Sequence, residues 1–296
     1  MTELSAGMAQ HRPTTSGLMS EEDWQQFFAG YSHIVLVANS DEQNFNEIHA
    51  AYPETTLFVF FNYVSKVLKT PFTRNSLLVA RTSRVGSELI YDNALDKVLA
   101  LLPGPGFTGV MSMRAATMEQ VTEPAEFGGV AAGAIDLCSY LEDFYPRDHT
   151  ASSGFALSVW LCEKVPQAKV VLCGFSGRRS RKWQMFHIHD WTFEQSVLQL
   201  LANSDKLEMA GRTAFNPYKA LSRHFPDIDN SNFVFAAIQV LSERLENSNR
   251  NLGKLITITM PLRVIYNLAR GLRIRSKKDR LVKQRKKQRA KNGEPS

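Results

Sequence analysis

Short apolar runs alternate with longer amphipathic stretches through the first two hundred residues. The runs are rich in β-branched and aromatic residues, and they lie at residues 33–38, 56–61, 76–81, 108–113 and 169–173. Such runs are typical of strands that are buried on both faces of a sheet. Helices are predicted between or after them, at residues 20–31, 41–52, 93–102, 130–141, 152–163 and 191–201. Strands that alternate with helices predict an α/β fold with a doubly wound, mainly parallel, Rossmann-like sheet.

The pattern changes near residue 216, after which only helices are predicted. These helices lie at residues 217–224, 231–245 and 253–275, so a C-terminal helical region follows the sheet. The first residues have no such pattern and are expected to be a disordered lead. The predicted organisation has four parts: a lead over 1–19, an α/β domain over 20–215, a helical extension over 216–253 and an amphipathic basic tail over 254–296.

Positive charge is concentrated in that tail. Residues 254–296 contain 14 Lys/Arg and 2 Asp/Glu, which leaves 21 basic and 27 acidic residues in the rest of a chain whose net charge is +6. Bulky apolar residues precede the densest basic run, an arrangement that suits an interfacial helix on an anionic membrane. The cations expected to contact the membrane are Arg270, Arg273, Arg275, Lys277 and Lys278. Alternatively, the apolar half of the tail packs on the rest of the protein, and only the basic end of the tail is solvated. RNA is a weaker candidate partner because no aromatic residue follows Tyr266.

The overall composition narrows the class of protein. Hydrophobic residues make up 44% of the chain and charged residues 22%, as in ordinary globular proteins. The three cysteines have no metal-ligand spacing and an odd count, so we expect free thiols in a reducing compartment. A membrane-spanning or exported protein is not expected, because the chain has no run of 18 apolar residues and its first twenty residues lack the layout of a secretory signal.

Candidate binding residues lie where the predicted strands end. Ligands of doubly wound sheets bind beyond the carboxyl ends of the strands. Asn39 and Ser40 follow the first strand, and Asn62 follows the second. The loop after the last predicted strand holds four cations, of which Arg178 and Arg179 are expected to contact a phosphate or carboxylate. The alternative for such a charge run is a solvated surface.

The segment over residues 185–194 contains the most reactive side chains. His187 and His189 alternate along a predicted extended strand, so both imidazoles lie on one face. A histidine at the end of that strand can take a proton from an attacking hydroxyl near neutral pH, and we expect His189 to do so. Glu194 would orient the segment or cap the following helix. A structural histidine fits the same pattern equally well.

Several known site patterns are incomplete in this chain. The loop Cys173-Gly-Phe-Ser-Gly-Arg178 has arginine in place of the last glycine of a hydrolase nucleophile elbow. The turn after the first strand lacks the glycines of a dinucleotide fingerprint. Asp227-Ile-Asp229 matches a metal-binding D-x-D, but Asp favours a helix N-terminus on dipole grounds alone. The two histidines have only loose candidates for a third ligand, so no metal site is expected.

The order of these elements resembles the sialyltransferases, which use CMP-activated sugars. Residues 33–203 share with that family a series of short features: an asparagine turn at Asn39, Asn62 after the second strand, the helix start Ser153-Gly154, Gly174 after a strand, and a histidine that leads into a helix. The spacing of His189 and Glu194 is that of the motif carrying the general-base histidine in animal sialyltransferases.

The resemblance implies a sialyltransferase-type variant of the GT-A fold and a role for each matched residue. Asn39 and Ser40 would approach the donor phosphate and sugar, Asn62 would contact the CMP moiety, and Ser153 and Gly154 would hold the nucleotide. His189 would be the catalytic base. The chain departs from bacterial relatives in two places: Asn-Ser-Asp replaces a glycine-rich turn after the first strand, and the tyrosines that bond the departing phosphate are missing after Gly174. The nearby arginines would replace those tyrosines electrostatically.

The implied function is an inverting glycosyltransferase that moves a 2-keto sugar acid, either sialic acid or Kdo, from its CMP donor to a hydroxyl. The acceptor would be a lipooligosaccharide, a lipopolysaccharide core or a capsule chain. Because CMP is a good leaving group with one phosphate, no cofactor and no obligatory metal is expected. Expected partners are the CMP-sugar, a lipid-linked oligosaccharide and an anionic membrane, with no nucleic acid. The expected location is cytoplasmic, peripheral on the inner face of the cell membrane. The alternative is a non-catalytic nucleotide- or glycan-binding module with the same sheet.

Overall fold

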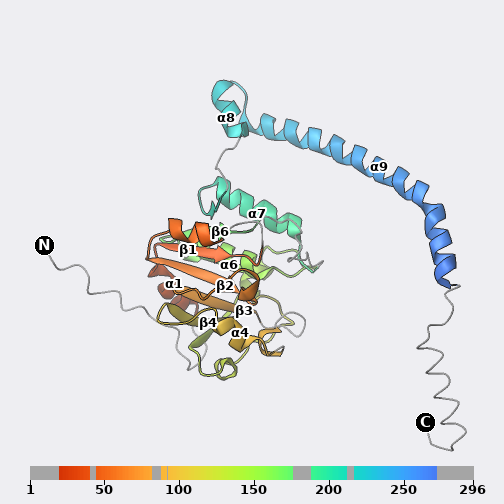
Figure 1. Cartoon of the computed structure of the whole chain (residues 1–296). Coiled ribbons are helices and arrows are strands. Elements are labelled where there is room, and N and C mark those ends of the chain that lie inside the picture. Colours follow the sequence, from red (N-terminus) through yellow and green to blue (C-terminus); the bar gives the residue numbers. More distant parts are fainter. Residues whose placement is uncertain are drawn as a thin grey trace, which may run out of the picture. The chain divides into compact units, whose positions relative to one another are not determined.

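The computed structural model of the chain describes residues 20–40, 45–81, 88–91, 93–175, 188–211 and 217–271. The chain divides into two compact units, Met1–Thr213 and Ala214–Ser296. The first unit contains the sheet and the second contains two helices (Figure 1).

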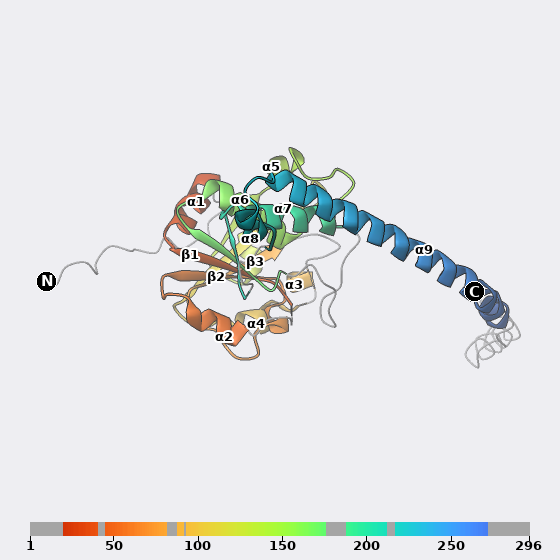
Figure 2. The same ribbon diagram turned by 90° about the horizontal axis from the view of Figure 1, so that it is seen from above.

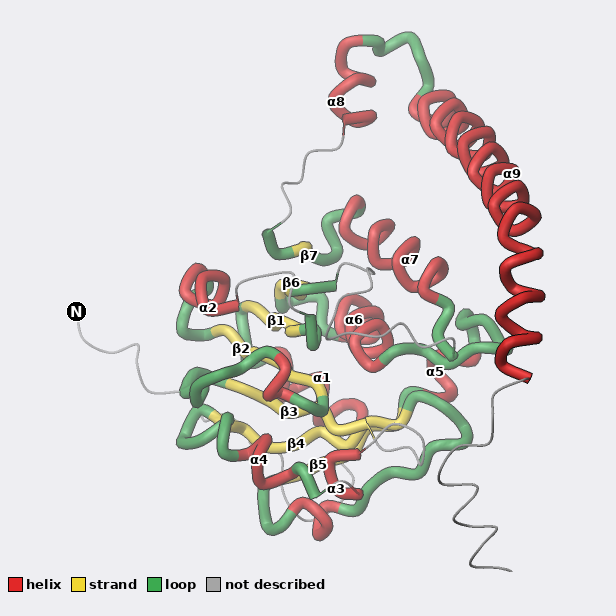
Figure 3. The backbone as a smooth tube through the Cα atoms, turned by 45° about the vertical axis from the view of Figure 1, so that its right-hand side comes forward, coloured by secondary structure: helices red, strands yellow, loops and turns green. Residues whose placement is uncertain are grey.

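Seven parallel strands form one sheet in the first unit. They are β1 (His33–Val37), β2 (Thr56–Phe61), β3 (Ser76–Arg81), β4 (Phe107–Arg114), β5 (Ala132–Asp136), β6 (Lys169–Cys173) and β7 (Glu208–Met209). Their order is β5-β4-β3-β2-β1-β6-β7, as Figure 3 shows in yellow. The chain builds outward from β1 to β5 and then adds β6 and β7 on the other side of β1. The predicted doubly wound α/β fold is confirmed, and the strand order reverses between β1 and β6.

Helices cover both faces of this sheet. They are α1 (Glu21–Ala29), α2 (Phe45–Ile48), α3 (Glu88–Tyr91), α4 (Leu95–Leu99), α5 (Cys138–Glu142), α6 (Ser153–Lys164) and α7 (Trp191–Asn203), with short 3₁₀ turns η1 (His49–Ala51), η2 (Val64–Lys66) and η3 (Pro124–Phe127). Helices α1, α6 and α7 lie on one face, and α2 and α4 lie on the other (Figure 2). Helix α1 begins at the predicted cap, where Ser20 and Asp23 form a reciprocal capping box.

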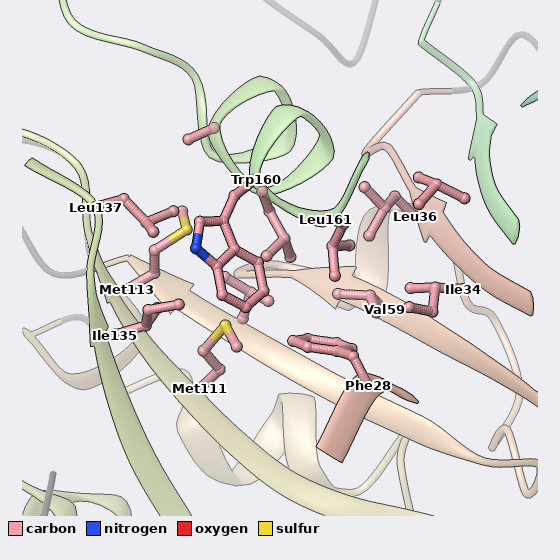
Figure 4. Packing of buried hydrophobic residues seen from close by; sticks show 14 of the residues in the cluster. Phe28, Ile34, Leu36, Val59, Met111, Met113, Ile135, Leu137, Trp160 and Leu161 are labelled. Atoms are coloured by element: carbon pink, nitrogen blue, oxygen red, sulfur yellow. The ribbon is translucent and has the colours of Figure 1, made fainter. Parts of the chain in front are cut away.

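The core on the α1 and α6 face is built around two tryptophans. Trp24 and Trp160 are fully buried, and the Trp160 ring packs among Met111, Met113 and other apolar side chains of the strands (Figure 4). Trp24 donates its indole N–H to the Ala134 carbonyl of β5 at 2.8 Å. The alternate strand residues face the other core, so the strands are buried on both sides, as their unbroken apolar runs predict.

One predicted helix is wrong. Residues 130–141 contain instead strand β5 and the short helix α5. The segment Ala132-Gly-Ala is rich in small residues, which carry no clear period, and pairing with β4 decides its conformation. Strand β5 therefore closes one edge of the sheet, where the sequence pattern predicts only a covering helix.

The second unit contains α8 (Pro217–His224) and α9 (Asn230–Gly271). Helix α9 runs unbroken through 42 residues and includes Pro261, although two shorter helices are predicted from the sequence (Figure 1). The two helices predicted from the sequence leave residues 246–252 between them, whereas the structure continues the helix through these residues. The predicted boundary between residues 253 and 254 lies inside α9. Among the residues that the structure describes, none of the helices combines the length and apolar character needed to cross a bilayer.

Candidate functional site

The site begins where the strand order reverses, because ligands of open α/β sheets bind beyond the strand ends at this point. Strands β1 and β6 pair there, and Ala38 N–H donates to the Cys173 carbonyl at 2.9 Å. Gly174 has φ +81°, and a Cβ at this residue would lie 3.3 Å from the Cβ of Ser40. The turn after β6 thus packs directly on the turn after β1, and the left-handed backbone of Gly174 favours glycine at this residue.

The two predicted asparagines lie at neighbouring strand ends, and both have partners within the protein. Asn39 donates its side-chain amide to the Phe61 carbonyl at 2.8 Å. Asn62 has a left-handed backbone with φ 42°, and its Oδ1 accepts from the backbone N–H of Arg81 at 3.0 Å. These bonds connect the carboxyl ends of β1, β2 and β3. Both asparagines therefore have a structural role in addition to any contact with a ligand.

The predicted Ser-Gly helix start is also at this edge of the sheet. Ser152 is the N-cap of α6, and Ser153 and Gly154 are its first two residues. Their backbone N–H groups precede the first intrahelical bond and lie at the positive end of the helix dipole, which favours an anion. A Cβ on Gly154 would lie 2.3 Å from the ring of Phe175, so this glycine also makes room for the turn after β6.

His189 lies beside the segment that leads into α6. Thr150 donates its backbone N–H to the Ile188 carbonyl at 2.7 Å, and the Nδ1 atom of His189 lies 2.5 Å from the Thr150 carbonyl oxygen. A carbonyl only accepts, so Nδ1 carries the proton and the lone pair of the neutral ring is on Nε2. Burial lowers the pKa of His189 below 6.5, and the positive charge of Arg81 lowers it further. The hydrogen bond to Thr150 raises the pKa and only partly opposes these two effects. The imidazole is consequently neutral at pH 7, which is the protonation state that a general base requires.

Glu194 connects the histidine segment with the start of α6. Its carboxylate is buried and accepts from the backbone N–H of Ser152 at 2.7 Å, the Ser152 hydroxyl at 2.6 Å and the Tyr145 hydroxyl at 2.8 Å. Asp190 caps α7 by accepting from the Phe193 N–H at 2.9 Å. Of the two predicted alternatives for Glu194, these contacts favour orientation of the segment, because the cap of α7 is Asp190.

Sequence reasoning missed Arg81, the last residue of β3. Its Nε donates to Glu119 Oε1 at 2.7 Å and its Nη1 to the Ala151 carbonyl at 2.5 Å. The rule that singled out Asn39 and Asn62, a polar residue at a strand end, applies equally to Arg81. Its partner Glu119 has no local signal, since it lies in a loop 38 residues away.

The contacts bring together Asn39, Ser40, Asn62, Ser153, Gly154, Glu194 and His189 at one edge of the sheet. Other predicted residues lie outside the described residues, namely Arg178, Arg179, His187, Arg273, Arg275, Lys277 and Lys278. Arg270 lies in α9, and its side chain is also outside the description. Among the described side chains, no group of three His, Cys, Asp or Glu could hold a metal ion.

Comparison with known proteins adds little to this geometry. No protein-family model matches the chain, and no curated protein is significantly similar to it. Among solved structures, the crystal structure of a mammalian sialyltransferase in complex with Gal-β-1-3GalNAc-ortho-nitrophenol aligns with a TM-score of 0.32 and 14% identity. The alignment covers 63% of this chain and 62% of the sialyltransferase chain, which is less than two thirds of that chain's length. A likeness at this level does not establish a shared function.

Proposed function

We propose that this chain is an inverting glycosyltransferase that moves a 2-keto sugar acid from its CMP donor to a hydroxyl, with His189 as the general base. The observation that carries the proposal is the set of contacts around residues 150–154. His189 bonds to Thr150, Arg81 to Ala151 and Glu194 to Ser152, immediately before the N-terminus of α6. A base thus lies a few residues from a group of N–H donors that suits a phosphate.

The proposed reaction is a single displacement at the anomeric carbon. The acceptor oxygen attacks this carbon and gives its proton to Nε2 of His189. The bond to the donor phosphate breaks, and CMP leaves with the electron pair. Donors at the start of α6, through the N–H groups of Ser153 and Gly154, would stabilise the phosphate charge as it develops. Asn39, Ser40 and Asn62 would line the donor side, with Arg178 and Arg179 as further phosphate contacts. One displacement inverts the configuration.

The donor, acceptor and location remain as the sequence predicts them. CMP-sialic acid and CMP-Kdo are both candidates, and the acceptor would be a growing lipooligosaccharide, lipopolysaccharide core or capsule chain at the inner face of the cell membrane. The basic tail over residues 254–296 would hold the enzyme at that surface. The reaction as written uses no cofactor.

A specific observation favours a second candidate, a non-catalytic nucleotide- or glycan-binding module. The side chains of both Asn39 and Asn62 are bonded to the backbone of neighbouring strands. Because these bonds connect neighbouring strands, they account for both asparagines without any contact to a substrate. The same sheet edge could therefore bind a nucleotide without turning it over.

The test combines nucleotide binding with CMP release. The wild type should bind CMP and release it from CMP-sialic acid or CMP-Kdo in the presence of acceptor. His189→Ala should lower turnover by about 10²- to 10⁴-fold and leave the Kd for CMP unchanged, since a general base contributes about that factor. His224→Ala, an exposed histidine of α8, is the matched control and should change neither quantity.

The pH profile gives an independent measurement. Because burial lowers the pKa of His189, the base is neutral at pH 7 and gains its proton only below pH 6.5. The acid limb of kcat/KM should therefore fall below pH 6.5, and it should be missing from the residual activity of His189→Ala. CMP that binds to the wild type without any release would support the binding module and exclude the transferase.

A further inference from the structure

Arg81 has an incomplete set of hydrogen bonds for a buried guanidinium. The residue is only 9% exposed, and its Nη2 atom is buried without any hydrogen-bond partner. A guanidinium has five N–H donors, and the Nε and Nη1 bonds use two of them. Leaving such a donor buried and unpaired costs free energy, and each such group calls for an explanation.

The ion pair with Glu119 does not supply that explanation. A carboxylate paired side by side with arginine would accept from two guanidinium nitrogens. Here Oε1 of Glu119 accepts from Nε alone, and Oε2 accepts from the backbone N–H of Ala115 at 2.9 Å. Glu119 therefore holds the loop after β4 and leaves Nη2 of Arg81 unused.

The position of Arg81 relates it to the proposed base. Nη1 of Arg81 and Nδ1 of His189 bond to the carbonyls of Ala151 and Thr150, which are consecutive residues. The two side chains therefore bond to adjacent peptide groups, which places both close to the segment that leads into α6. The effect of the Arg81 charge on the pKa of both His189 and Glu194 agrees with this closeness.

A 2-keto sugar acid carries its carboxylate on the anomeric carbon, which is the atom that the acceptor attacks. A group that binds this carboxylate must therefore lie next to the general base. We infer that Arg81 binds the carboxylate of the sugar acid through Nη2, an inference that rests on the proposed function. The planar fork of arginine matches a carboxylate better than an ammonium does. Because Nη2 is covered in the ligand-free chain, the carboxylate must displace the atoms that cover it.

The experiment compares ligands with and without the negative charge. The probes are CMP, CMP-sialic acid, CMP-Kdo, and the C1 methyl esters of the two CMP-sugars, measured by calorimetry. The wild type should bind each acid more tightly than its ester by on the order of tenfold to a hundredfold, the range expected for hydrogen bonds to a charged group. Arg81→Gln should bind acid and ester alike, and Arg81→Lys, which keeps a positive charge, should retain only part of the preference. Both variants should lose more affinity for the acid than for CMP.

Glu119→Gln is the matched control because it removes the same ion pair and keeps the guanidinium. This variant should retain the preference for the acid. The inference is overturned if Glu119→Gln loses the preference as fully as Arg81→Gln does, or if both Arg81 variants weaken CMP, acid and ester equally. Equal binding of acid and ester by the wild type also overturns it, whether or not the variants fold. If the wild type binds no cytidine nucleotide at all, the proposed function fails, which is a distinguishable result.

Discussion

Glu194 is a buried carboxylate that accepts hydrogen bonds from two groups of Ser152 and from Tyr145. Burial raises the pKa of Glu194, and the three hydrogen bonds oppose that change. Only a carboxylate can accept all three bonds at once, because an amide would turn an N–H toward a donor. The side chain therefore fixes the start of α6 relative to α7.

Replacing this carboxylate by an amide should destabilise the fold. Glu194→Gln can keep the two bonds to Oε1 but places an amide N–H opposite the Ser152 hydroxyl, and the loss of that charge-assisted bond costs about 1–3 kcal/mol of the free energy of unfolding. Urea denaturation followed by circular dichroism measures the loss. Glu126→Gln, at an exposed glutamate, should stay within about 0.5 kcal/mol of the wild type. Equal midpoints for the two variants would mean that the Glu194 network contributes nothing to stability.

The residues of the site differ in how visible they are in the sequence. Asn39 and Asn62 are recognisable because each follows an unbroken apolar run, and the sheet brings their ends together. Arg81 also ends an apolar run, but its buried contacts with Glu119 and Ala151 depend on tertiary packing. Tyr145 and Glu119 carry no local signal, since their roles arise from contacts 49 and 38 residues away. Periodicity predicts elements, whereas such partners depend on tertiary packing.

At the scale of elements, α1 is part of the core although it precedes the first strand. Its Trp24, Phe27 and Phe28 are buried, and the Phe28 ring lies 6.1 Å from the ring of Trp160 in α6. The indole bond to Ala134 extends this contact to β5. One short helix at the start of the first unit thus packs against elements more than a hundred residues further along the chain.

Deleting α1 should therefore unfold the sheet. Removing a single buried Phe or Trp side chain typically costs about 3–5 kcal/mol, so the loss of three approaches the whole stability of a domain, about 5–15 kcal/mol. A chain that starts at residue 32 should lose its cooperative urea transition. A chain that starts at residue 20 keeps the capping box at Ser20 and should unfold at the wild-type midpoint. A wild-type transition in the shorter chain would show that α1 is dispensable.

The elements that sequence periodicity missed share a physical cause. Strand β5 is built from small residues, and β7 has only two residues, so neither presents an apolar run. Helix α9 continues through residues 246–252, where the sequence pattern predicts no helix. In β5 and β7 pairing with the neighbouring strand determines the conformation, and the side-chain pattern carries little information about it.

At the scale of the whole molecule, the two units differ in charge and surface character. Residues 1–213 contain 17 Lys/Arg and 23 Asp/Glu, while residues 214–296 contain 18 Lys/Arg and 6 Asp/Glu, and 14 of those 18 cations lie in residues 254–296. Helix α9 of the second unit also has a series of exposed apolar side chains: Val234, Phe235, Ile238, Val240, Leu241, Leu245, Leu255, Ile258 and Met260. Exposed apolar residues followed by a dense cationic run are the features of a segment that binds an anionic lipid surface.

Deletion of residues 273–296 should therefore weaken binding to anionic vesicles. The deletion removes 11 Lys/Arg and leaves the described helices intact. Each cation near such a surface contributes about 1 kcal/mol, so partitioning onto phosphatidylglycerol vesicles should fall at least about tenfold. The difference should shrink when salt rises from 50 to 300 mM, because salt screens these contacts.

Neutral phosphatidylcholine vesicles should bind both chains weakly and equally. CMP binding should be unchanged, since the nucleotide site is proposed to lie in the first unit. If the two chains partition equally onto anionic vesicles at low salt, the tail is a solvated extension and the membrane location has to be abandoned.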